Sequence, residues 1–177
     1  MMPWTRLSST IRYTRDKLVL REDGWRLPDG TERVYPVLVA GPAVAILAFV
    51  DDARVVLVRQ YRHLQQGPSW ELPGGGVQPG EDPLAAAQRE LREESGYRAG
   101  RLEFLTRFHP ANAYLDEIGH CYVARDLTAD PLPADDDEFF EQALVPFSEV
   151  LRMVLADEIT ESYSKIAVLR YALTADR

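Results

Sequence analysis

Residues 75–97 read GGVQPGEDPLAAAQRELREESGY, a glycine-rich turn that leads directly into a helix with marked ends. Asp82 has the side chain of a helix N-cap, and Pro83 suits the first helical position, where no backbone N–H is needed. Gly96 suits the left-handed conformation that commonly follows a last helical turn. The segment therefore predicts a helix over residues 83–95.

Three glutamates of this helix share one face. Glu90, Glu93 and Glu94 stand at positions i, i+3 and i+4, which are neighbours on a helix of about 3.6 residues per turn. Like charges at these spacings destabilise a helix, whereas converging carboxylates are what hard cations such as Mg²⁺ and Mn²⁺ bind. By itself the spacing fits either a solvated acidic face or a metal site.

The remaining faces of the helix have simpler expected roles. Leu84, Ala87 and Leu91 form an apolar face that should pack on a sheet. Arg89 is placed to pair with Glu93 on the helix or with Glu81 in the preceding loop, and so to hold the acids in position.

The rest of the chain predicts a mixed sheet flanked by helices, in an α/β (α+β) fold. Residues 54–61 should return as the hairpin partner of residues 44–49. A turn around residues 27–30 joins two early strands, which predict an N-terminal β extension over 1–40 with its own small antiparallel sheet, before a main domain over 41–177. Predicted strands cover 13–20, 32–39, 44–49, 54–61, 101–108, 119–124 and 142–145, and further helices cover 148–155 and 162–173.

Composition restricts the partners and the compartment. The chain has 177 residues, a net charge of -8 and a single cysteine, so it forms no intrachain disulfide and repels nucleic acid and anionic membranes. No stretch has the ~20 apolar residues of a membrane span, and the start lacks the apolar core of a signal peptide. We expect a cytoplasmic protein that binds a small phosphate ester only with help from a divalent cation or local arginines.

The pattern Gly75-x5-Glu81-x7-Arg89-Glu90-Leu91-x-Glu93-Glu94-x-Gly96-Tyr97 matches the Nudix signature at every defined position. This resemblance implies a Nudix α/β/α sandwich whose acids hold Mg²⁺, or alternatively Mn²⁺, against a diphosphate. It implies that Glu90 and Glu94 are direct ligands, that Glu93 is a further or water-mediated ligand, and that the Gly74 carbonyl is an additional one. Gly75, Glu81, Arg89 and Gly96 would then be structural.

Hydrolysis of a pyrophosphate requires an attacking water and a group that takes its proton. In relatives that cleave ADP-ribose, a loop at the place of residues 135–138 supplies that acid, so Asp136 and Glu138 are the candidates, together with Glu93. A solvated acidic turn is the alternative interpretation of this loop.

Outside the box, the chain resembles the ADP-ribose and nucleoside diphosphate sugar pyrophosphatase branch. The segments VRQYR (58–62) and WELPG (70–74) resemble that branch's approach to the box, which implies that Arg62 contacts a substrate phosphate unless it is simply a surface arginine. Residues 108–117, FHPANAYLDE, resemble the specificity loop and carry Glu117 where relatives contact substrate or water. Ala111-Asn112-Ala113 replaces the usual Ser-Pro-Gly, which weakens ADP-ribose as the particular substrate.

The N-terminal strands also resemble that branch, in which they exchange between the subunits of a homodimer. Trp25 or Tyr35 could stack on a base, with core packing as the alternative. The resemblance thus implies metal-dependent hydrolysis of a nucleoside diphosphate linked to a sugar, giving a nucleoside monophosphate and a phosphorylated remainder. The alternatives are a nucleoside triphosphate or dinucleoside polyphosphate hydrolase, and a non-catalytic nucleotide-sugar sensor.

Overall fold

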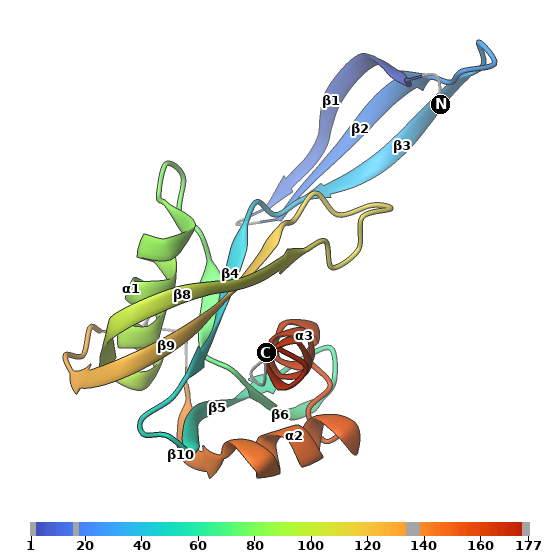
Figure 1. Ribbon diagram of the computed structural model, residues 1–177. Coiled ribbons are helices and arrows are strands. Elements are labelled where there is room, and N and C mark those ends of the chain that lie inside the picture. Colours follow the sequence, from blue (N-terminus) through green and yellow to red (C-terminus); the bar gives the residue numbers. More distant parts are fainter. Residues whose placement is uncertain (1–2, 16–17, 134–138, 175–177) are drawn as a thin grey trace. The chain divides into compact units, whose positions relative to one another are not determined.

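The computed structural model describes residues 3–15, 18–133 and 139–174 (Figure 1). Contacts between residues divide the chain into two compact units. The first contains Met1–Gly41 and His109–Ile118, and the second contains Pro42–Phe108 and Gly119–Arg177. The loop that resembles a specificity loop therefore clusters with the N-terminal strands.

The first unit is built on a three-stranded antiparallel sheet, in the order β1 (Thr5–Arg15), β2 (Leu18–Arg26) and β3 (Glu32–Val39). The expected turn joins β2 to β3: Gly30 adopts a φ of 84° and donates its N–H to the Leu27 carbonyl at 3.0 Å. The small antiparallel sheet is confirmed. The single strand predicted over 13–20 is wrong, because this stretch spans the end of β1 and the start of β2, with Arg15 paired to Leu18.

Backbone hydrogen bonds fasten the 109–118 loop to the end of β3. The Leu38 N–H donates to the Tyr114 carbonyl at 2.7 Å, and the Asp116 N–H donates to the Leu38 carbonyl at 3.1 Å. The Asp116 carboxylate also accepts a bond from the Ala40 N–H at 3.0 Å. The loop is therefore an ordered extension of the sheet.

The second unit contains two sheets. One has the order β10 (Glu141–Pro146), β5 (Arg54–Arg62) and β6 (Gly67–Glu71), and the other has the order β7 (Gly74–Gly76), β4 (Ala43–Ala48), β9 (Gly119–Ala129) and β8 (Tyr97–Phe108). Strands β4 and β9 run parallel while the other neighbours are antiparallel. The mixed sheet that the sequence predicts is confirmed.

Strand β4 shows how helices cover both faces of this sheet (Figure 1). Val44, Ile46 and Ala48 belong to a core that includes the buried apolar residues of α1 (Pro83–Ser95). The alternate residues Ala45 and Leu47 belong to a second core shared with α2 (Phe147–Leu155) and α3 (Ser162–Ala172). The two-residue period of the strand thus produces the helix–sheet–helix layering. None of the helices in the described residues is long and apolar enough to cross a membrane.

Two local expectations are wrong. Strands β4 and β5 are not hairpin partners, since they lie in different sheets and share only the bridge between Phe49 and Val55. Both are apolar on both faces, so their sequences did not indicate which neighbours they pair with. Leu84 was predicted in the apolar face of α1 but is 43% exposed. Ala86 lies instead beside Ala87 and Leu91 in the buried face of the helix.

Candidate active site

The ends of α1 are fixed by the residues predicted to fix them. Asp82 accepts a hydrogen bond from the Leu84 N–H at 2.9 Å, and Pro83 begins the helix. Gly96 ends it with a φ of 73° and donates its N–H to the Arg92 carbonyl at 3.1 Å. The helix predicted over residues 83–95 is confirmed, and its ends set the position of the glutamates between them.

Glu90 and Glu94 are buried rather than solvated. Each is only 8% exposed, and the Glu93 side chain is 21% exposed. The Glu94 carboxylate accepts a hydrogen bond from the Gly74 N–H at 2.8 Å, which ties the helix face to β7. Because two buried carboxylates on one face are costly without compensation, a solvated acidic face no longer explains the spacing.

Two glycines of β7 make room for this arrangement. A Cβ at Gly75 would lie 2.7 Å from the carboxyl carbon and from both oxygens of Glu90. A Cβ at Gly74 would lie 2.2 Å from the Val44 carbonyl oxygen in β4. Gly74 therefore permits the strand pairing, and Gly75 permits a carboxylate to lie directly against the backbone.

Arg89 holds the acids together. Its guanidinium donates to Glu81 at 2.9 Å, to Glu90 at 2.7 Å, to Glu93 at 2.8 Å and to the Gly76 carbonyl at 2.9 Å. Both ion pairs considered from the sequence are present. The hydrogen bonds from Arg89 lower the pKa of Glu81, and Glu81 in turn raises the pKa of Arg89.

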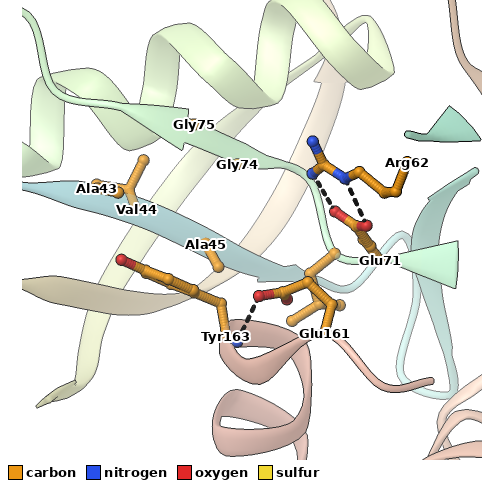
Figure 2. A pocket seen from close by; sticks show the side chains of 10 residues that line it. Ala43, Val44, Ala45, Arg62, Glu71, Gly74, Gly75, Glu161 and Tyr163 are labelled. Carbon is orange, nitrogen blue, oxygen red and sulfur yellow. Dashed lines mark hydrogen bonds and ion pairs between the residues drawn. The ribbon is translucent and has the colours of Figure 1, made fainter. Parts of the chain in front are cut away.

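A cavity of about 160 Å³ lies beside β7 (Figure 2). Arg62 enters it from β5 and forms a two-point ion pair with Glu71, with Nε 2.9 Å from Oε1 and Nη2 bonded to Oε2. These bonds raise the pKa of Arg62, with smaller contributions from Glu161 and Glu94. The cavity is lined by Ala43, Val44, Ala45, Arg62, Glu71, Leu72, Gly74, Gly75, Glu161 and Tyr163.

The start of α3 places Glu161 and Tyr163 in the cavity wall, and neither was predicted from the sequence. Glu161 caps the helix by accepting bonds from the N–H groups of Tyr163 at 2.8 Å and Ser164 at 2.7 Å. The Leu72 N–H donates to the Ser164 hydroxyl at 2.9 Å, which fastens this helix end to the cavity wall. An acid directly before a helix was the available signal for the cap, but nothing local indicated that it faces Arg62.

The donor set near β7 fits a divalent cation in type. It consists of carboxylate and carbonyl oxygens, which Mg²⁺ prefers, and a Cβ at Gly75 would fill the space in which the Glu90 carboxylate lies. Within the described residues, no three His, Cys, Asp or Glu side chains already meet around one point. In the structure, Glu90 and Glu93 each form an ion pair with Arg89.

Other predicted site residues lie elsewhere. Asp136 and Glu138 fall outside the described residues. Trp25 and Glu117 belong to the first unit, where the Trp25 ring packs edge-on against Trp4 with 6.5 Å between centroids. Their roles as substrate contacts remain predictions.

Known proteins resemble this chain over most of its length. The model of the NUDIX domain matches residues 39–166. An ADP-ribose pyrophosphatase of Bacillus subtilis is 32% identical over 157 residues, covering 85% of each chain. One from Mycobacterium tuberculosis is 34% identical over 166 residues, covering 92% of this chain and 80% of the relative.

Two further matches differ in what they show. A methanol dehydrogenase activator of Bacillus methanolicus is 34% identical over 151 residues, covering 84% of this chain and 82% of the relative. The crystal structure of an ADP compounds hydrolase superimposes with a TM-score of 0.87 over 99% of this chain and 96% of that one, at 24% identity, and so supports the fold.

These matches agree with the helix, the buried acids and the glycine strand found in the structure. The resemblance of residues 75–97 to the Nudix signature is confirmed, as is the expectation of an enzyme that acts on pyrophosphate bonds. The chain belongs to the NUDIX domain family.

Proposed function

We propose that this protein hydrolyses the pyrophosphate bond of a nucleoside diphosphate linked to a sugar or similar group, with Mg²⁺ or Mn²⁺ as cofactor. The products would be a nucleoside monophosphate and a phosphorylated remainder. The observation that carries this proposal is the continuity of the Arg62 cavity with the buried acids: Gly74 lines the cavity and donates its N–H to Glu94.

The acids of α1 would hold the cation. Glu90 and Glu94 would supply carboxylate oxygens, with Glu93 and the Gly74 carbonyl as further ligands. When bound, a divalent ion lowers the pKa of a coordinated water and neutralises phosphate oxygens. Arg89 binds one oxygen each of Glu90 and Glu93, so it would keep the acids in place before the cation binds.

Arg62 would bind a phosphate of the substrate. Its side chain is 45% exposed at the cavity, and a guanidinium matches the geometry of phosphate oxygens. The proton of the attacking water would pass to Glu93, Asp136 or Glu138. Glu117 would contact the substrate or the catalytic water, and Trp25 would stack on the base.

The substrate class follows from the relatives rather than from the cavity. Both ADP-ribose pyrophosphatases align with most of this chain, which supports a nucleotide conjugate as substrate. The residues Ala111-Asn112-Ala113 in the 109–118 loop weaken ADP-ribose as the particular substrate, so ADP-ribose and other nucleoside diphosphate sugars are both candidates. Nucleoside triphosphates and dinucleoside polyphosphates are the second candidates.

The test is a panel of ADP-ribose, ADP-, UDP- and GDP-sugars, dinucleoside polyphosphates and nucleoside triphosphates, each with Mg²⁺ or Mn²⁺. We expect release of a nucleoside monophosphate from at least one diphosphate conjugate. Glu94→Gln should abolish this turnover, because the amide keeps an acceptor for Gly74 but loses the charge that binds the cation. Wild-type protein that cleaves none of the conjugates would refute the function, and an active Glu94→Gln variant would refute the ligand assignment.

We also propose that the protein is a homodimer that pairs through the N-terminal sheet. All eleven residues of β1 are exposed, and Ile11 and Val34 are 64% and 63% exposed. Strand β1 is also an edge strand of its sheet, and an exposed edge can pair with another chain. Light scattering should give twice the mass of one chain, and Ile11→Lys should reduce it to one; a monomeric wild type would contradict the proposal.

A further inference from the structure

Arg62 is held by Glu71, an acid to which the proposed function assigns no role. Glu71 is buried, with its side chain 5% exposed, and both of its oxygens bind the Arg62 guanidinium (Figure 2). The Gln60 amide adds a third, longer contact of 3.4 Å to Glu71. A carboxylate this buried is costly unless it is paired, so its position is fixed by these partners.

The strand register shows what this ion pair does to Arg62. Strands β5 and β6 pair Arg62 with Gly67, whereas Glu71 stands opposite Val58, four residues further along the ladder. The Arg62 side chain therefore runs back along the sheet toward the β7 end, where Gly74 and Glu94 lie. The bond to Glu71 thus directs the guanidinium away from the open end of the strand.

The pairing leaves Arg62 able to bind a ligand. A guanidinium has five N–H groups in a planar fork, and the two-point bond to Glu71 uses two of them. The Arg62 side chain lines the cavity and is 45% exposed, so its other N–H groups are available to a ligand there. A rigid fork loses less conformational entropy on binding than a mobile one.

We propose that Glu71 is a positioning residue, which orients Arg62 for the substrate phosphate and does not itself contact the reacting atoms. This inference rests on the proposed function of Arg62. It requires that loss of Glu71 affects binding through Arg62 and through no other route.

The first measurement follows Arg62 directly. In the wild type, the Arg62 Nε–H should give a ¹⁵N–¹H resonance that is protected from solvent exchange, since it is bonded to Glu71 at 2.9 Å. Glu71→Gln should move this resonance to the position and fast exchange of a solvent-exposed arginine. An unchanged resonance in Glu71→Gln would overturn the proposal.

The second measurement is kinetic. Glu71→Gln should raise KM for the best conjugate of the panel roughly tenfold, the loss expected for one charge-assisted hydrogen bond, and leave kcat within about twofold. The double variant Arg62→Gln/Glu71→Gln should have the KM of Arg62→Gln alone, because two residues that act in series are not additive. Additive losses, or a fall in kcat at constant KM, would overturn the proposal.

Glu141→Gln is the matched control. Glu141 of β10 pairs at 3.1 Å with Arg59, which lies in β5 as Arg62 does, but neither Glu141 nor Arg59 lines the cavity beside β7. This variant should leave KM and the Arg62 resonance unchanged. Absence of turnover in the wild type would count against the proposed function alone, because the Arg62 resonance reports on Glu71 without any substrate.

Discussion

Gly75 shows how a single missing side chain controls the site. A Cβ at this position would lie 2.7 Å from the end of the Glu90 side chain, which is flexible and can move aside. Gly75→Ala should therefore fold normally but displace a predicted metal ligand. We expect kcat/KM to fall at least tenfold and Mn²⁺ affinity to weaken, measured by steady-state kinetics and calorimetry.

The neighbouring glycine provides the control for this prediction. A Cβ at Gly76 would meet no heavy atom within 4 Å, so Gly76→Ala should retain both activity and Mn²⁺ binding. Equal losses in the two variants would show that the strand as a whole needs glycine and that the contact with Glu90 is irrelevant. Gly74→Ala should fail in another way, because its Cβ would meet the backbone of β4 and disrupt the pairing.

At the level of elements, Glu81 ties the loop before α1 to the helix itself. It accepts bonds from Arg89 and from the Gln78 N–H at 2.9 Å, and Arg89 lowers its pKa below the ordinary value of about 4.3. A carboxyl whose folded-state pKa is lowered stabilises the protein above its unfolded-state pKa, and this stability is lost as the pH falls through the folded-state pKa.

Glu81→Gln should therefore reduce the free energy of unfolding by about 1–2 kcal/mol at pH 7. The difference from the wild type should persist down to about pH 5 and be smaller at about pH 3, because the contribution of the carboxylate declines as the pH falls from the unfolded-state pKa toward the lower folded-state pKa. Urea unfolding at the two pH values measures it. A difference that is the same at both would assign the effect to packing and not to the ion pair.

Elements that depend on neighbouring residues could be predicted from the sequence, and those that depend on distant partners could not. Asp82, Pro83 and Gly96 act within one turn of α1, so its ends were evident. The parallel partner of β4 is β9, whose residues lie about 75 positions away, and two apolar strands carry no signal for that choice. The same limit hid Glu161, which reaches the Arg62 cavity only because α3 packs on the sheet.

At the scale of the whole molecule, charge predicts that substrate binds together with a cation. The chain has a net charge of -8, and the described residues around β7 bring Glu71, Glu90, Glu93, Glu94 and Glu161 together with Arg62 and Arg89. A diphosphate entering this surplus of carboxylates would be repelled. Substrate binding should therefore depend on divalent cations, which the folded protein would also bind in the absence of substrate.

Cation binding should then stabilise the protein by mass action. Mg²⁺ at about 100 times its Kd should add about 2.7 kcal/mol, which raises Tm by roughly 5–10 °C for a chain of this size. Differential scanning calorimetry with MgCl₂, and after removal of the metal with a chelator, measures this shift. KCl at the same ionic strength should reproduce only the screening of charge, and Glu94→Gln should show only that smaller effect. If KCl raised Tm as much as MgCl₂, or if Glu94→Gln kept the full shift, the carboxylates of α1 would not be the cation site.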